Sequence, residues 1–153
     1  MTTANHSILT LTETALEAYA TASYADGRIE DAATALEALV TLDPERADAW
    51  ALLGVVHRRK KDLPKALRAL KRAVDLDDSD RYALLNLGEA LCEAKRPKEG
   101  VALLRAVVEQ GLDADLAPEQ HDPMTIRAGA MLEAIQLSLR AWISAHPEPP
   151  TGA

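Results

Sequence analysis

The residue types that could bind a metal ion are densest in the segment DLDDSD, residues 75–80. Carboxylates at alternate positions are ligands of a calcium loop, which also needs glycine at its sixth position and glutamate at its twelfth. Here Asp80 occupies the glycine position and Asn86 occupies the glutamate position. The segment therefore predicts no metal site.

Other side chains with catalytic potential are scattered along the chain. The four histidines, His6, His57, His121 and His146, form no zinc-binding helix pattern, and the seven glycines form no phosphate-binding loop. Cys92 is the only cysteine, which excludes an internal disulfide, and we expect a small buried thiol rather than a reactive one. No nucleophile, base and orienting group can be assembled, so we expect no enzyme, no cofactor and no metal.

A basic run, HRRKK at residues 57–61, comes at the end of an expected helix. The helix dipole stabilises cations at this end, so one interpretation is a solvated helix terminus. The other is an electrostatic rim that steers an acidic partner.

Composition favours one globular domain made of closely packed helices. The 153 residues are 48% hydrophobic and 27% charged, with no Phe, two Trp and three Tyr, so Ala, Leu and Val must build the core. A net charge of −7 argues against binding to nucleic acid or to an anionic membrane. The first residues, MTTANHSILTLTE, lack the pattern of a signal peptide, and no run is long enough to span a membrane. We expect a cytoplasmic protein without membrane insertion.

The sequence repeats itself every 34 residues. Large residues and small residues recur in four columns, which are Leu16, Trp50 and Leu84, then Ala20, Gly54 and Gly88, then Ala32, Ala66 and Gly100, then Leu36, Leu70 and Leu104. Small residues at fixed positions allow two helices to approach closely. Each copy is therefore predicted to be a helical hairpin.

Helix start and stop signals agree with three hairpins. A capping-box pattern at Thr10 to Glu13 predicts a first helix over 11–25, and Asp26-Gly27 and Asp43-Pro44 bound the second. The following helices are expected at 47–60, 63–76, 81–94 and 97–110. Asp122 and Pro123 predict the start of a last helix over 123–145. Residues 1–10 are expected to be a flexible segment and 146–153 a disordered tail.

The repeat resembles the tetratricopeptide repeat. The residues that carry the resemblance are Trp50, Leu53, Gly54, Ala66, Leu70, Ala73, Leu76 and Asp77. The resemblance implies an all-α fold at 11–145, in which repeats at about 13–46, 47–80 and 81–112 form a short right-handed solenoid closed by the capping helix. Lys61 and Lys95 depart from the pattern because they occupy the position that Gly27 holds in the first copy. We therefore expect altered turns there.

A solenoid of this family turns one face of each first helix toward its concave side. The family's inner-face columns imply a peptide-binding groove lined by Glu17, Thr21, Tyr24, Ala51, Leu52, Val55, Arg58, Tyr82, Leu85, Asn86 and Glu89. The resemblance implies a protein or peptide client, held as an extended segment. The subclass that binds a C-terminal carboxylate needs Lys, Asn and Arg on this face, and only Asn86 remains of that set.

The first repeat and the chain's layout are also similar to the class II translocator chaperones of bacterial type III secretion. The matching residues are Tyr24 to Ala32, followed by Leu36, Leu39, Leu42 and Asp43. This likeness implies a chaperone or adaptor, and a homodimer through the N-terminal segment and the first repeat.

Two alternatives stay open at this stage. The groove could be covered from within, by the N-terminal segment SILTL or by the last helix, whose Met131, Leu132, Ile135, Leu139 and Trp142 recur at helical spacing. We expect that helix mainly to cover the end of the third repeat. Alternatively, the chain is a structural scaffold subunit of a secretion, motility or envelope assembly, which binds folded partners through its convex face or last helix.

Overall fold

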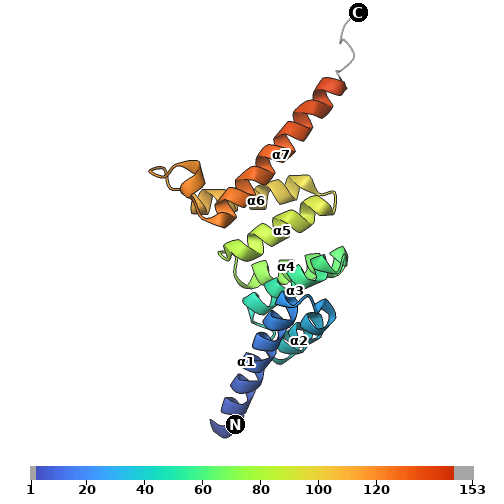
Figure 1. The fold of residues 1–153 in the computed structure, drawn as a ribbon, viewed down its shortest axis with the longest axis vertical. Coiled ribbons are helices and arrows are strands. Elements are labelled where there is room, and N and C mark those ends of the chain that lie inside the picture. Colours follow the sequence, from blue (N-terminus) through green and yellow to red (C-terminus); the bar gives the residue numbers. More distant parts are fainter. Residues whose placement is uncertain (1–2, 147–153) are drawn as a thin grey trace, which may run out of the picture.

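The computed structural model describes residues 3–146, which form a stack of helices with α1 and α7 at its opposite ends (Figure 1). Its α-helices are α1 (Thr3–Ala25), α2 (Ile29–Leu42), α3 (Ala47–Arg59), α4 (Leu63–Leu76), α5 (Arg81–Glu93), α6 (Pro97–Gly111) and α7 (Pro123–Ala145). A short 3-10 helix, η1 (Pro118–Gln120), lies in the loop before α7. The fold is an all-α solenoid of three helical hairpins with a C-terminal capping helix, as the sequence predicted.

The helix boundaries agree closely with the expected ones, except at the start of the chain. α1 begins at Thr3 instead of residue 11, so the residues expected to be a flexible segment are helical from Thr3 on. The capping-box prediction at Thr10 is wrong, because Thr10 lies inside α1 and not at its start. Threonine hydroxyls of this region donate to backbone carbonyls one turn earlier in the same helix. The hydroxyl of Thr14 donates to the carbonyl of Thr10, and that of Thr12 to Ile8. Of the predicted tail, residues 147–153 lie outside the described residues.

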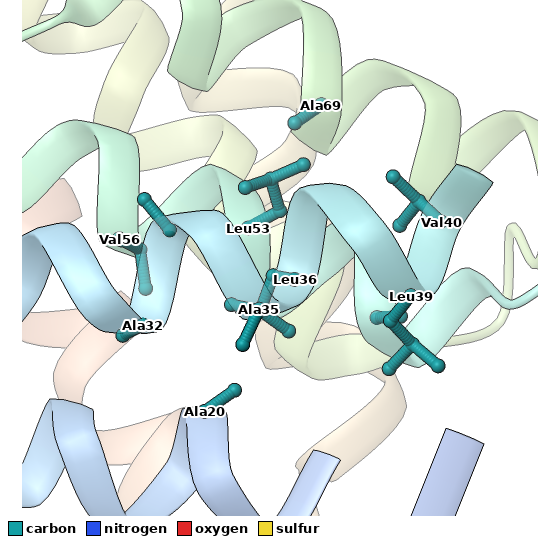
Figure 2. Packing of buried hydrophobic residues seen from close by; sticks show 11 residues of the cluster. Ala20, Ala32, Ala35, Leu36, Leu39, Val40, Leu53, Val56 and Ala69 are labelled. Carbon is teal, nitrogen blue, oxygen red and sulfur yellow. The ribbon is translucent and has the colours of Figure 1, made fainter. Parts of the chain in front are cut away.

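The core between the first two hairpins is made of aliphatic side chains and alanines (Figure 2). α2 contributes most of them and lies between α1 and α3, with Leu36 and Leu39 almost fully buried. Val56 and Leu53 of α3 pack against α2 from the other side. Within the second hairpin, a repeated small residue lets α3 and α4 approach closely: a methyl group added to Gly54 would lie 2.4 Å from Cγ of Leu70.

The three hairpin turns share one backbone conformation. Gly27, Lys61 and Lys95 have φ values of 78°, 66° and 62°, in the left-handed region that favours glycine. In each turn the amide of the following residue donates to the carbonyl five positions earlier, as from Asp62 to His57. The altered turns predicted at the two lysines are thus glycine-type turns that carry a lysine.

The capping helix α7 packs against α6 and α5, as the sequence predicted. Ala128 is fully buried in a cluster with Leu84, Leu85 and Val107, and the apolar side chains of Met124, Met131, Leu132 and Ile135 pack against this cluster. The outer half of α7 extends beyond the stack (Figure 1), and Leu139 and Trp142 are 55% and 60% exposed there. The predicted apolar stripe of α7 is therefore only half used for capping.

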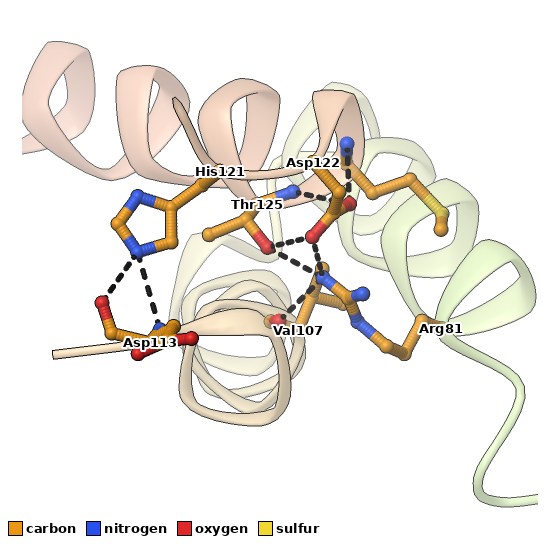
Figure 3. A network of polar contacts seen from close by, with 7 residues as sticks. Arg81, Val107, Asp113, His121, Asp122 and Thr125 are labelled. Carbon is orange, nitrogen blue, oxygen red and sulfur yellow. Dashed lines mark hydrogen bonds and ion pairs between the residues drawn. The ribbon is translucent and has the colours of Figure 1, made fainter. Parts of the chain in front are cut away.

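A polar cluster fixes the start of α7 (Figure 3). Asp122 caps the helix by accepting from the amides of Met124 and Thr125. The Arg81 guanidinium donates to Asp122, to the Thr125 hydroxyl and to the carbonyl of Val107. The Thr125 hydroxyl also donates to Asp122, and this bond first, followed by those from Arg81 and the two amides, holds the pKa of the Asp122 carboxyl well below its usual range. One arginine thereby ties α5, α6 and α7 together.

Candidate functional site

The concave side of the first two hairpins carries an open apolar pocket. Four of the predicted groove residues line it, namely Thr21, Tyr24, Leu52 and Val55, together with the core residues Ala20, Leu36 and Val56. The pocket has a volume of about 40 Å³, which is far below the ~300–1,000 Å³ of small-molecule sites. Its exposed lining is almost entirely apolar. The pocket therefore suits one aliphatic side chain of a partner better than a cofactor.

A second, polar pocket adjoins the apolar one. It is lined by Tyr24, Val55, Arg58, Arg59, Lys61 and Glu93, so Tyr24 and Val55 belong to both pockets. The Arg59 guanidinium lies over the Tyr24 ring, 4.8 Å from its centroid, in a cation–π contact. Arg59 and Lys61 were not among the predicted groove residues, because the family's columns include only Arg58 from the basic run.

The basic run HRRKK does not act as one charged patch. His57 is buried, and burial lowers the pKa of its imidazole. Lys60 points to another repeat, where its ammonium lies 2.6 Å from Glu30. Arg58 turns inward, while Arg59 and Lys61 stay exposed at the polar pocket. Of the two interpretations, a solvated helix end therefore describes only Arg59 and Lys61, the two residues of the run that are exposed.

Four of the predicted groove residues are closed off, three of them in the third repeat and Ala51 in the second. Leu85 is 2% exposed because α7 packs over it, and Ala51 is 1% exposed against Ala73 and Ala83 of the neighbouring helices. Asn86 and Glu89 are buried as well. None of these four side chains is available to a ligand in this structure.

A network of charges fills this part of the concave side. Glu89 pairs with Arg58 of α3 at 2.6 Å and with Arg127 of α7 at 2.5 Å. Asn86 accepts from Arg58 and donates to the carbonyl of Tyr82. Sequence reasoning missed Arg127, since α7 lies outside the repeat and its residues have no counterpart 34 positions away.

Two predicted groove residues remain at the edges of this surface. Tyr82 is 38% exposed, and burial, followed by the nearby Tyr24, raises the pKa of its phenol. Glu17 is half-buried and pairs with Arg46 at 2.9 Å. The open part of the predicted groove thus runs over α1 and α3 and reaches α5 only at Tyr82.

The residues considered for chemistry have structural roles. Asp80 caps α5 through the amide of Tyr82, and Asp77 accepts from the amide and hydroxyl of Ser79. No group of three potential metal ligands occurs in the described part of the chain. Cys92 is half-buried, and burial, with the nearby Glu89 and Glu93, raises the pKa of its thiol, which makes it a poor nucleophile. Among residues 3–146, no helix has the length and apolar character needed to cross a membrane.

Comparison with known proteins finds the repeat directly. Two sequence profiles described as tetratricopeptide repeat match residues 17–80 and 57–118. Peroxisome biogenesis protein 5 of Arabidopsis thaliana is 44% identical over 62 residues, which are 40% of this chain and 8% of that protein. The peroxisomal targeting signal receptor of Yarrowia lipolytica is 39% identical over 61 residues, 40% of this chain and 10% of that receptor. The matched segment is thus about a tenth of the length of these relatives.

Solved structures show the same fold over most of the chain. The type III secretion translocator chaperone SycD of Yersinia enterocolitica superposes with a TM-score of 0.73 at 23% identity, over 83% of this chain and 85% of that one. SycD in complex with a peptide of the translocator YopD superposes with a TM-score of 0.70 at 23% identity, over 82% of this chain and 92% of that one. A SycD structure described as an alternative dimer superposes with a TM-score of 0.72 at 24% identity, over 83% of this chain and 93% of that one. The architecture, with three hairpins and a helix after them, therefore resembles that of the class II translocator chaperones.

Proposed function

Because the chain belongs to the tetratricopeptide repeat family, we propose that it is a chaperone or adaptor that holds an extended segment of a partner protein in its concave groove. The observation that carries this proposal is the open apolar pocket of Thr21, Tyr24, Leu52 and Val55. The fold leaves these side chains uncovered, although it closes the same face at the third repeat. The role requires no catalysis.

The shape of the open surface favours an extended segment over a folded partner. The surface runs across α1 and α3 as a short groove and has polar groups at its edges, among them Tyr82 and Arg59. A chain laid in it can bury one side chain in the pocket and leave its neighbours at the polar edge. Burying a Leu or Val side chain contributes about 1.5–3 kcal/mol, which suits a reversible complex.

For the cellular role we propose a translocator chaperone similar to those of bacterial type III secretion, acting in the cytoplasm. The fold likeness to SycD and the YopD peptide bound by that protein support this choice. In such a role the groove would shield a segment of its client that aggregates or assembles too early when it is left free.

We also propose a homodimer through the N-terminal segment and the first repeat. The first half of α1 supports it, because Ile8, Leu9 and Leu11 are 61%, 42% and 70% exposed. A row of apolar side chains on one end helix is a surface that a second copy can cover. SycD, to which the fold is similar, has been described as a dimer.

A second candidate function is that of a structural scaffold, as the outer half of α7 suggests. Leu137, Leu139, Trp142 and Ile143 are between 54% and 64% exposed there. A cleft formed by α4, α5 and α6, which includes Leu67, Leu87 and Leu103, offers another apolar surface away from the groove. In this role, folded partners would bind α7 or the cleft and leave the groove empty.

A crosslinked pull-down from the native cell separates the two functions. Val55→Arg places a charge in the groove, Trp142→Arg places one on α7, and Ala38→Arg, at an exposed site of α2, is the matched control. Circular dichroism must first show that all variants stay helical. We expect one partner to be captured by the wild type and by the Ala38 and Trp142 variants but lost from the Val55 variant. Loss only from the Trp142 variant would overturn the groove proposal in favour of the scaffold.

A further inference from the structure

The apolar and polar pockets of the groove form one continuous surface, since Tyr24 and Val55 line both. A partner side chain in the apolar pocket is therefore next to the polar one. In an extended segment, side chains two positions apart lie on the same side and about 6.5–7 Å apart. Neighbouring residues of one short segment can thus occupy both pockets.

The charges at the polar pocket are not balanced. Arg58 is neutralised from within, because its guanidinium lies 2.6 Å from Glu89 and 3.5 Å from Glu93. Lys60, which precedes Lys61, is paired with Glu30. Arg59 and Lys61, by contrast, have no carboxylate partner within residues 3–146, although the chain as a whole carries a net charge of −7. The groove therefore holds a local excess of positive charge.

Both unpaired cations line the polar pocket, and the fold positions the Arg59 side chain and the Lys61 backbone. The Arg59 guanidinium lies over the Tyr24 ring, which leaves its edge free to donate to a carboxylate. Lys61 occupies the left-handed turn position, where its amide donates to the carbonyl of Arg58 at 3.0 Å. Two unpaired cations beside an apolar pocket favour an acidic group over a neutral one.

We propose that the groove selects segments in which an aspartate or glutamate lies two residues away from an aliphatic side chain. This inference rests on the proposed function and names the chemistry of the client. A side-chain carboxylate fits better than a C-terminal one, because Asn86, the remaining member of the carboxylate-binding set, is already bonded to Arg58 and to the carbonyl of Tyr82.

Three short peptides test the proposal, each acetylated and C-terminally amidated so that no terminal carboxylate is present. The first contains Gly-Ser-Leu-Ser-Glu-Ser-Gly, the second has Gln in place of Glu, and the third has Ser in place of Leu. Binding is followed by two-dimensional nuclear magnetic resonance of the labelled protein at two salt concentrations. We expect the Glu peptide to shift the resonances of Leu52 and Val55. At low salt its affinity should be at least about threefold higher than that of the Gln peptide. The Ser peptide should bind most weakly.

The variant Arg59→Gln with Lys61→Gln should remove the preference for Glu and keep the affinity for the Gln peptide. The matched control is Lys60→Gln with Lys65→Gln, which removes the same charge from outside the polar pocket and should keep the preference. Equal binding of the Glu and Gln peptides at Leu52 and Val55 would overturn the acidic preference and leave the proposed groove function intact. If neither leucine-containing peptide shifts these resonances, the groove function itself fails.

Discussion

The carboxylate of Glu89 on α5 lies 2.6 Å from the Arg58 guanidinium of α3. The same carboxylate pairs with Arg127 of α7, and its side chain is only 5% exposed. One acidic residue thus joins the second repeat, the third repeat and the capping helix on the concave side. This pairing fills the concave side at the third repeat, whereas the first two repeats keep an open apolar pocket.

The first prediction concerns this network. Glu89→Gln keeps the size of the side chain but removes the charge between two arginines, so the free energy of unfolding should fall by about 2 kcal/mol. This lies below the ~3–5 kcal/mol for breaking a buried pair, because Arg58 and Arg127 are 19% and 55% exposed. Denaturation in urea measures the change. Glu99→Gln is the control, since its pair with Arg96 is exposed and its loss should leave the stability nearly unchanged. An equal loss in both variants would show that the buried pairing has no special role.

The second prediction concerns the close approach of helices at the repeated glycines. Gly54→Ala should lower the free energy of unfolding by about 1–3 kcal/mol, because the new methyl group would lie 2.4 Å from Cγ of the buried Leu70 and 3.1 Å from its amide nitrogen. Gly129→Ala is the matched control in α7. Its methyl group would meet nothing within 4 Å, so alanine's better helix propensity should stabilise the protein by up to about 1 kcal/mol. Thermal unfolding of both variants should show shifts of opposite sign, and shifts of the same sign would contradict the packing argument.

The third prediction concerns the hairpin turns. Lys95 has a φ of 62°, a conformation that costs a residue with a side chain about 1 kcal/mol relative to glycine. Lys95→Gly should therefore raise the midpoint of urea unfolding. Lys98→Gly, an exposed site in the first turn of α6, removes the same charge but should lower the midpoint. A lower midpoint for both would mean that the turn is not strained by its lysine.

Much of the fold could be predicted from the sequence, because its signals are local. Proline, aspartate and glycine mark the ends of α2 to α7, and the 34-residue shift pairs the helices into hairpins. The start of α1 could not be predicted from its threonines. A threonine hydroxyl can cap a helix, or it can donate to the carbonyl four residues earlier inside a helix, as it does here.

The candidate site was less predictable, because it depends on contacts between distant segments. The repeat columns identified Thr21, Tyr24, Leu52 and Val55, which line the open pocket. The same columns could not indicate that α7 covers Leu85, because a position in a repeat does not specify which helix packs over it.

The last prediction concerns His57, whose counterpart 34 residues later is Leu91. Both side chains are buried, but Nδ1 of His57 has no hydrogen-bond partner in the described structure. His57→Leu should raise the free energy of unfolding by about 1 kcal/mol at pH 7.5, since it removes this buried polar atom. Burial disfavours the charged imidazolium form and so lowers the pKa of His57. The folded state then binds fewer protons than the unfolded state, so wild-type stability should decrease as the pH falls through about 6.5.

The leucine variant should lack this decrease, and the stability gap between the two proteins should widen toward pH 5. Glu37, whose carboxylate lies 3.7 Å from Nε2 of His57, favours the protonated ring and moderates the effect. Urea denaturation of both proteins between pH 7.5 and 5 measures the gap, with His146→Leu as a control at an exposed site. A gap that narrows toward pH 5 would mean that the pairing with Glu37 outweighs burial, and that protonation of His57 stabilises the contact between α2 and α3.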